Sequence, residues 1–227
     1  TFIGLFLNQS SGTLTPGAWT VNGLVSLSAS AGNINIDGNI NNTGAVRLNS
    51  TGTVTQAAPI TAAGLELLGA GGTYTLTDTG NAISVVAGNT GSVNLTNNAP
   101  NWSIGTVNTV GLHTTGNTTL NTTGTVTQTA LINAIGLNLL GSGGAYTLTN
   151  TGNAFTTLAG NTGSMNVTNS LPMTISSAMA TGDININNTG ALSTSGLVES
   201  TGGSVTMTAH SPLTIGGGGV TAATGVN

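Results

Sequence analysis

Short segments in which polar and apolar residues alternate recur along the whole chain. Each follows a glycine, as in Asn33-Ile34-Asn35-Ile36 after Gly32 and Ser92-Val93-Asn94-Leu95 after Gly91. Alternation with a period of two places one set of side chains on each face of a β-strand. The pattern therefore predicts many short strands, each with an apolar face that points toward a core.

The glycines that precede these segments repeat at a nearly constant spacing. They are Gly12, Gly32, Gly52, Gly72, Gly91, Gly111, Gly124, Gly144, Gly163, Gly182 and Gly202, and their numbers rise in steps of 20, 20, 20, 19, 20, 13, 20, 19, 19 and 20. Three short strands and three turns in about 20 residues form one triangular coil of a parallel β-helix. The short step from Gly111 to Gly124 has two interpretations: this coil lacks one side of the triangle, or Gly105 is the turn glycine.

Similar residues occupy the same place in successive coils. The predicted inward column is Leu14, Ile34, Val54, Tyr74, Val93, Leu112, Val126, Tyr146, Met165, Ile184 and Val205, without a charged residue. A single coil cannot bury enough apolar surface to offset its ordering, whereas stacked coils share a core and pair their backbone groups. We therefore predict an all-β fold, a parallel β-helix of about eleven coils.

A longer repeat is superimposed on the shorter one. The segment Thr53–Thr96 returns as Thr125–Thr168, a shift of 72, with 30 identities in 44 aligned positions. Repeats of this kind mark architectures that grow by stacking. We expect one β-helix segment over residues 1–227, with an internal duplication of 53–124 and 125–196. Because the chain starts without Met and ends within the pattern, we expect it to be a fragment of a longer rod.

The composition excludes several classes of function. Charged residues make up 3% of the chain and hydrophobic residues 37%, which favours an ordered protein over a disordered one. Arg47 is the single basic residue besides two histidines, so we expect no nucleic-acid partner. Without Cys there is no disulfide or thiolate site. The apolar run Phe2–Leu7 is too short for a membrane span and lacks the basic flank of a signal peptide.

Residues suited to catalysis or metal binding are few and dispersed. Polysaccharide-degrading β-helices need clustered carboxylates with a basic partner, whereas Asp37, Asp78 and Asp183 fall in different coils and Lys is absent. His113 and His210 each lack a second ligand at metal spacing. We therefore expect no catalytic residues, no metal site and no cofactor.

Two further patterns have a structural interpretation that we prefer. The runs Gly69–Gly72 and Gly141–Gly144 lack the Lys and the helix of a phosphate loop, so we predict tight turns. Aromatic residues suitable for stacking on sugars are Trp19, Trp102, Tyr74, Tyr146 and Phe155. Because Tyr74 and Tyr146 belong to the inward column, we predict that they fill the core.

Several segments resemble the β-helical repeats of filamentous-haemagglutinin-like adhesins, which Gram-negative bacteria export by two-partner secretion. They are Ile60–Gly69, Gly72–Thr77 and Ala87–Gly91, together with their second copies. The resemblance implies a right-handed β-helix, passage through an outer-membrane transporter, and a secreted rod at the bacterial cell surface. It also implies adhesion or fibre formation as the task.

Two hypotheses of function follow. The first is a structural or adhesive segment of a cell-surface or extracellular fibre, without catalysis. Its partners would be a host or neighbouring cell surface, glycans, or further copies of itself. The second is a β-helix that binds or degrades polysaccharide. Acidic residues clustered in one groove would favour the second hypothesis, and the sequence contains no such cluster.

Overall fold

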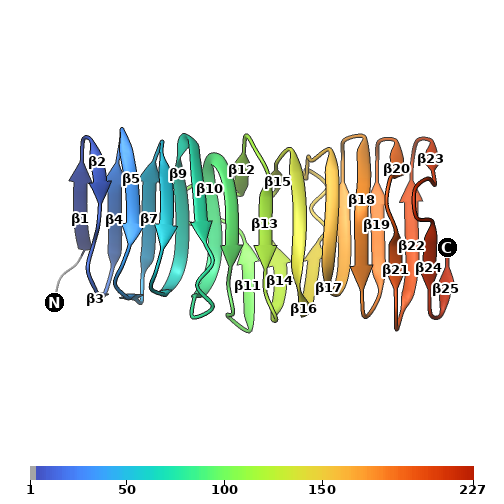
Figure 1. Ribbon diagram of the computed structural model, residues 1–227, viewed down its shortest axis with the longest axis horizontal. Coiled ribbons are helices and arrows are strands. Elements are labelled where there is room, and N and C mark those ends of the chain that lie inside the picture. The colour runs from blue at the N-terminus through green and yellow to red at the C-terminus, as the bar shows by residue number, and fades with distance from the viewer. Residues whose placement is uncertain (1–3) are drawn as a thin grey trace.

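The strands wind into an elongated parallel β-solenoid, and the first and last described strands lie at opposite ends of the rod (Figure 1). The computed structural model describes residues 4–227, so the start of the apolar run Phe2–Leu7 lies outside it. Strands stack in about eleven turns of roughly 20 residues, which confirms the predicted all-β parallel solenoid. Within the described residues there is no helix long and apolar enough to cross a membrane.

Three ladders of parallel strands, called here faces A, B and C, run along the rod. Face A is interrupted between Asn133 and Met173, where an isolated bridge joins Asn133 to Ala154. Face A contains β1 (Gly4–Gln9), β4 (Leu24–Ala29), β7 (Ala45–Ser50), the middle of β9 (Ile60–Leu76) and of β10 (Ala82–Thr96), β12 (Leu112–Thr114), β15 (Ile132–Asn133), the start of β18 (Met173–Ala180), β20 (Leu192–Thr194) and β23 (Leu213–Thr214).

Face B follows face A along each coil. It contains β2 (Gly12–Leu14), β5 (Gly32–Ile36), β8 (Thr53–Gln56), the ends of β9 and β10, β13 (Thr118–Asn121), the starts of β16 (Gly136–Leu148) and β17 (Thr157–Asn169), the end of β18, β21 (Val198–Ser200) and β24 (Val220–Ala222).

Face C completes each coil. It contains β3 (Trp19–Val21), β6 (Ile40–Asn42), the starts of β9 and β10, β11 (Asn101–Ile104), β14 (Thr125–Gln128), the ends of β16 and β17, β19 (Ile184–Asn188), β22 (Ser204–Ala209) and β25 (Gly225–Val226).

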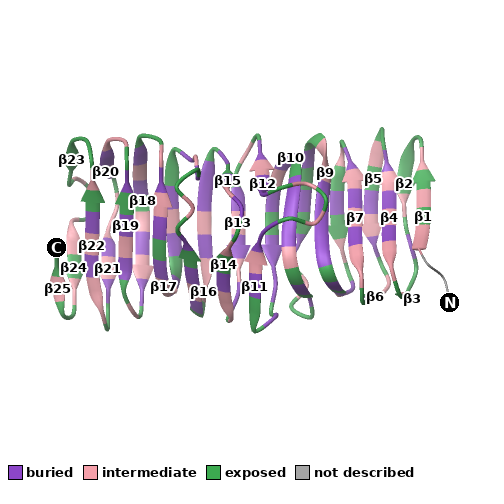
Figure 2. Ribbon diagram, turned by 180° about the vertical axis from the view of Figure 1, so that it is seen from behind, coloured by how far each residue is buried: buried purple, intermediate pink, exposed green. Residues whose placement is uncertain are grey.

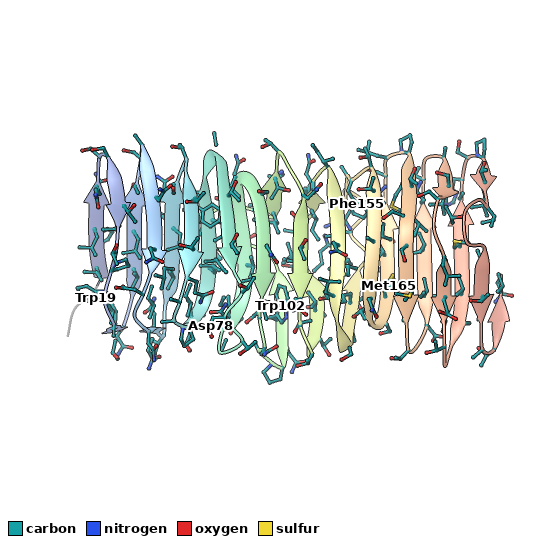
Figure 3. The ribbon with its side chains drawn as sticks, viewed as in Figure 1. Trp19, Asp78, Trp102, Phe155 and Met165 are labelled. Atoms are coloured by element: carbon teal, nitrogen blue, oxygen red, sulfur yellow. The ribbon has the colours of Figure 1, made fainter. Side chains whose placement is uncertain are left out.

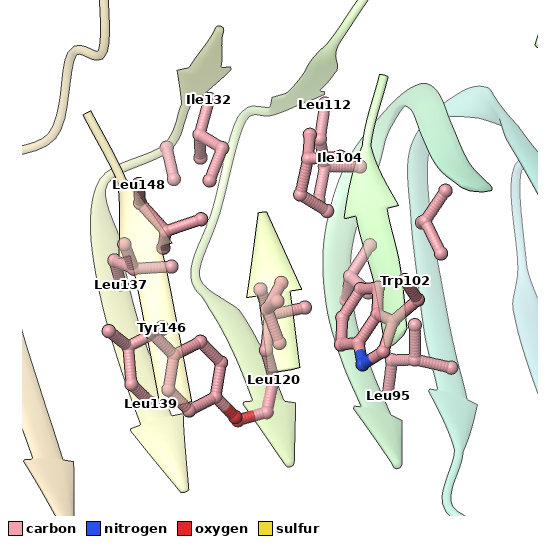
Figure 4. Close-up of a cluster of buried hydrophobic side chains, with 14 of the residues drawn as sticks. Leu95, Trp102, Ile104, Leu112, Leu120, Ile132, Leu137, Leu139, Tyr146 and Leu148 are labelled. Carbon is pink, nitrogen blue, oxygen red and sulfur yellow. The ribbon is translucent and has the colours of Figure 1, made fainter. Parts of the chain in front are cut away.

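The apolar side chains of the three faces meet along the axis of the rod. Ten of the eleven residues predicted to point inward are buried, and Leu14, in the N-terminal coil, is partly buried against the same core. Figure 4 shows how Leu120, Leu139, Tyr146 and other core residues of neighbouring coils lie close together. Because each coil covers the inward side chains of the coil before it, the core is continuous.

The predicted inward column is in fact two columns. Val93 on face B pairs with Thr118, not with Leu112. Val126 pairs with Trp102 and belongs to face C. The prediction of a single column was therefore wrong between Val93 and Val126, although the residues on both sides of that break do point inward.

Both interpretations of the short step from Gly111 to Gly124 were also wrong. The glycine that follows Gly91 along its ridge is Gly116, whose backbone N–H donates a hydrogen bond to the carbonyl of Gly91 at 2.7 Å. The coil that leads from Thr96 to its partner Asn121 is long, because the two are 25 positions apart. Its extra residues lie in a segment between β11 and β12, residues 105–111.

The long coil changes the face on which the longer repeat returns. Thr53–Gln56 forms β8 on face B, whereas its second copy, Thr125–Gln128, forms β14 on face C. Three coils lead from Val54 to Thr118 on face B, and Val126 follows soon after on the next face. The two copies are thus related by a third of a turn about the rod as well as by a shift along it.

One buried asparagine lies at the equivalent bend of each copy of the repeat. The Oδ1 atom of Asn81 accepts a hydrogen bond from the N–H of Ile60 at 2.8 Å, and its Nδ2 donates to the carbonyls of Leu76 and Thr96 at 3.3 and 3.0 Å. Asn153 makes the equivalent bonds to Ile132, Leu148 and Thr168. Side-chain amides thereby satisfy backbone groups that the ladder leaves free at a bend.

Replacement of Val126 by Asp tests the register of the second half of the rod. Val126 is fully buried, so an unpaired carboxylate there should lower the free energy of unfolding by about 3 kcal/mol or more. Thr127→Asp is the matched control, because Thr127 is exposed on the other side of the same strand. Denaturant unfolding followed by circular dichroism measures both variants. Equal losses in the two variants would contradict the register.

Candidate functional site

The extra residues of the long coil form a loop that folds back over face A. Figure 2 shows a loop crossing β10 toward β9 on this side of the rod. The loop closes on itself, since the N–H of Gly111 donates to the carbonyl of Gly105 at 2.8 Å and Thr106 pairs with Val110 in an antiparallel bridge. This is the one antiparallel pairing within residues 4–227. The loop thus covers parts of β9 and β10, which belong to earlier coils.

Gly64 of β9 lies directly beneath this loop. A β-carbon at Gly64 would lie 3.0 Å from one methyl group of Val107 and 3.2 Å from the other. These distances are shorter than ordinary carbon contacts. A glycine at this position thus gives the loop room to approach the sheet.

Glu66 holds the loop to the rod. Its Oε1 atom accepts hydrogen bonds from the backbone N–H and the hydroxyl of Thr109, at 2.6 and 2.7 Å. Its Oε2 atom accepts from Nε of Arg47 at 2.5 Å. The Glu66 side chain is 0% exposed and that of Arg47 is 30% exposed, and in the part of the chain that the structure describes this is the single ion pair. A buried carboxylate is thereby matched by three donors.

The protonation of Glu66 follows from these contacts. Burial alone would raise the pKa of the carboxyl group, but the hydrogen bonds from Thr109 and Arg47, with the charge of Arg47, outweigh it and lower the pKa. The charged form is therefore the one that binds the loop.

The sequence analysis missed this cluster. Arg47 and Glu66 are neighbours across one coil, so the period of the coils contained the signal for their ion pair. The period of the coils does not predict the position of Thr109. That position depends on a loop that leaves the period, and no spacing along the chain places that loop over Glu66.

The three aspartates remain apart, each at its own place along the rod. Asp78 lies in the turn between β9 and β10 (Figure 3), where its Oδ1 accepts from the N–H of Gly80 at 2.7 Å. Asp183 accepts from the N–H and the hydroxyl of Ser204 at 2.8 and 2.9 Å, and these bonds lower the pKa of Asp183. Asp37 is exposed after β5.

The two histidines also lie in separate coils. A ring nitrogen of His113 is 3.1 Å from the carbonyl of Val110, at the base of the loop, while His210 is exposed after β22. Across residues 4–227, no three His, Asp or Glu side chains gather closely enough to share a metal ion.

The glycine runs, for which we predicted tight turns, lie inside the continuous strands β9 and β16, at bends where the pairing with the next coil shifts register. Gly69 and Gly71 have φ values of 113° and 78°, and Gly141 and Gly143 have values of 110° and 94°. These values lie in the left-handed region, which glycine adopts without strain. A β-carbon at Gly69 would also lie 2.1 Å from the carbonyl oxygen of Ser50, so the bend excludes any side chain there.

The two tyrosines fill the core, as predicted. Their hydroxyl groups donate to backbone carbonyls, from Tyr74 to Leu48 at 3.0 Å and from Tyr146 to Leu120 at 2.8 Å. Burial raises the pKa of both phenols. No aromatic ring of the pair is therefore available at the surface.

The other three aromatic residues also pack against the core. Trp102 is buried and donates to the hydroxyl of Thr122 at 3.3 Å. Phe155 is fully buried, and Trp19 is partly buried at the N-terminal end. The five candidates for sugar stacking thus contribute mainly to the interior of the rod.

Uncharged hydrogen-bonding side chains form the outer surface instead. Along face B, one outward position in successive coils holds Asn35, Thr55, Thr75, Asn94, Thr119 and Asn138. The hydroxyl of Thr55 donates to Oδ1 of Asn35 at 3.1 Å, so neighbouring members of this ladder can bond to each other. At these six positions a partner meets hydroxyl and amide groups, without charge.

The pH dependence of stability isolates the contribution of Glu66. Because its pKa is lowered on folding, the stability from Glu66 is present above the unfolded value of about 4.3 and is lost as the pH falls through the lower folded value. Glu66→Gln should therefore show a smaller loss of unfolding free energy between about pH 6 and pH 3 than the wild type. Chemical unfolding at both pH values measures this change in the free energy of unfolding.

Thr75→Val is the control for this experiment. Thr75 is an exposed, uncharged residue on face B, and its replacement removes no titratable group, so the acid response should stay at the wild-type level. A Glu66→Gln variant that responds to acid as the wild type does would show that Glu66 is not coupled to folding.

Comparison with known proteins gives one match. Residues 38–90 match a family described as repeats of unknown function (DUF5649). The matched segment runs from the turn before β6 into β10 and includes Gly64, Glu66 and Asn81. No curated protein and no solved structure shows significant similarity to the chain. The chain thus folds as a β-solenoid, and one segment of it is similar to a known family of repeats. Both observations are consistent with a structural repeat protein.

Proposed function

We propose that this chain is a structural and adhesive segment of a secreted or cell-surface fibre, without a catalytic role. The observation that carries the proposal is the uninterrupted stack. Eleven strands follow one another on face B, one for each coil, and the same core runs beneath them all. A rod of this construction serves to present a long surface or to hold other parts of a fibre at a distance.

The first and last described coils carry apolar side chains that are less buried than those of the neighbouring coils. In the last coil, Leu213 is 44% exposed and Val226 is 52% exposed, whereas their partners one coil earlier, Leu192 and Val205, are buried. At the other end, Leu5 is only partly buried. Another coil, from the same chain or from a second copy, would cover these side chains and pair the free strand edges.

The absence of charge supports association at these ends. No Asp, Glu, Lys or Arg occurs in residues 4–36 or 200–227. Charged residues on edge strands are a common means of preventing edge-to-edge association. Self-association into fibres is therefore part of the proposal.

The outer surface supports adhesion through neutral groups. Ladders of Thr, Asn and Ser offer hydrogen bonds to a host or neighbouring cell surface and to its glycans. Arg47, the single strong cation, already pairs with Glu66, which argues against a nucleic-acid partner. Secretion through an outer-membrane transporter is proposed on the resemblance to filamentous-haemagglutinin-like repeats.

Adhesion is tested with beads that carry the purified chain. Coated beads should adhere to bacterial or epithelial cells above the level of beads coated with the heat-unfolded chain. A glycan array screened with the same protein identifies any sugar partner. Enzymatic release of sugars from a polysaccharide by the purified chain would overturn the proposal in favour of the polysaccharide-degrading alternative.

Association through the rod ends is tested by sedimentation velocity. The sedimentation coefficient of the wild type should rise with protein concentration, and the double variant Leu213→Asp with Val226→Asp should show a much smaller rise because charge opposes stacking. Ile135→Asp is the control, since Ile135 is 55% exposed in the middle of the rod. Equal association by all three proteins would exclude the C-terminal end as the contact.

A further inference from the structure

The surface under loop 105–111 has a counterpart in the second copy of the repeat. Across face A, Arg47, Glu66 and Ala87 lie side by side in successive coils. Their counterparts in the second copy, Thr119, Asn138 and Ala159, do the same across face B. Gly64 and Gly136 occupy equivalent positions next to Glu66 and Asn138. The two surfaces are therefore built alike.

The second of these surfaces is open. It forms a hollow of about 260 Å³ lined by Asn117, Thr119, Gly136, Leu137, Asn138, Thr157, Ala159 and Ser176. In the first copy, residues 105–111 leave the coil and cover the site. In the second copy, residues 173–180 form β18, which stays in the ladder apart from a β-bulge at Ser176, opposite Leu158 and Ala159. Among the described residues, no fold-back segment lines the hollow.

The open site differs from the covered one in its chemistry. Thr119 and Asn138 replace Arg47 and Glu66, so the ion pair becomes a hydroxyl and an amide. Asn117 and Thr157 replace Ala45 and Val85, so apolar rims become polar ones. No hydrogen bond within residues 4–227 engages these four polar side chains of the hollow.

The groups above the equivalent glycines, Gly64 and Gly136, also change from apolar to polar. A β-carbon at Gly136 would lie 2.5 Å from Oγ1 of Thr157 and 2.9 Å from Oδ1 of Asn117. In the covered site the methyl groups of Val107 fill the equivalent space, whereas in the second copy the side chains of Thr157 and Asn117 fill it themselves. A partner therefore meets their oxygen atoms at the edge of the hollow and must hydrogen-bond to them.

We propose that this hollow, the Asn138 hollow, is a docking site for an uncharged turn of another protein chain. The covered copy shows the geometry, because the N–H and the hydroxyl of Thr109 both donate to one oxygen of Glu66. Asn138 carries a carboxamide oxygen at the same position and can accept from a Ser or Thr of a partner turn. A polar residue two positions earlier in that turn would meet Asn117 and Thr157.

This site deepens the proposed adhesive function, on which it rests, by naming a partner chemistry. The absence of charge in the hollow favours a neutral partner, since a buried unpaired charge is unfavourable. The partner is a polypeptide turn because a polypeptide turn occupies the equivalent surface in the first copy.

A cyclic peptide tests the proposal. The loop ends are adjacent, as Gly111 donates to Gly105 at 2.8 Å, so a head-to-tail cyclised peptide of residues 105–111 with Val107→Asn reproduces the turn. It should bind the full chain saturably, as measured by NMR shifts. Asn138→Ala should weaken binding by about tenfold, through loss of the central acceptor. Asn185→Ala, at an outward position of β19 outside the hollow, should leave the affinity unchanged.

An exchange variant provides the second measurement. Asn117→Ala, Thr119→Arg, Asn138→Glu and Thr157→Val together recreate the residues of the covered surface. This variant should bind the cyclic peptide with the natural Val107 more tightly than the wild type does. Circular dichroism melting of each variant verifies that the stack is intact.

Two outcomes would overturn the site. One is the absence of saturable binding of the peptide to the wild type, or binding that Asn138→Ala does not change. The other is binding of neutral oligosaccharides in the hollow in place of the peptide. If either occurs while coated beads still adhere to cells, the docking site is wrong and the adhesive function stands. If the beads also fail to adhere, both are wrong.

Discussion

The pairing of each coil with the coils above and below it is the interaction on which the rest of this structure depends. A single coil with a handful of inward side chains cannot offset its own ordering, but a stack shares both its core and its backbone hydrogen bonds. Where the chain bends and the ladder is interrupted, other groups must take its place. Asn81 and Asn153 do so with their amides, and Gly69 allows the backbone to approach the carbonyl of Ser50.

The same constraint determines how the rod accommodates extra residues. An insertion cannot enter the ladder without breaking its register, so residues 105–111 leave the coil and pack on the outside. Their attachment to Glu66 converts an irregularity into an ordered part of the surface. The long coil also rotates the second copy of the repeat by one face, so equivalent residues emerge in different directions.

The functional character of the rod follows from what the stack leaves on its outside. Backbone groups are satisfied within the ladder and most apolar side chains lie in the core, so the faces present mainly hydroxyls and amides. Differences between individual side chains at equivalent surfaces then determine what each part of the rod presents to a partner. The covered surface around Glu66 and the open hollow around Asn138 share the same repeat pattern, but loop 105–111 covers only the first, and four side chains differ between them.

The sequence by itself determined the parallel solenoid, the inward column on each side of residues 105–111, the positions of the glycine bends and the core tyrosines. These features are local or repeat with the coil, so alternation and spacing report them directly. Only the tertiary structure decided the path between Gly91 and Gly124, the third of a turn between the copies, and the contact of Thr109 with Glu66. Those features depend on where a loop outside the period comes to rest, and side chains 43 residues apart meet there by packing alone.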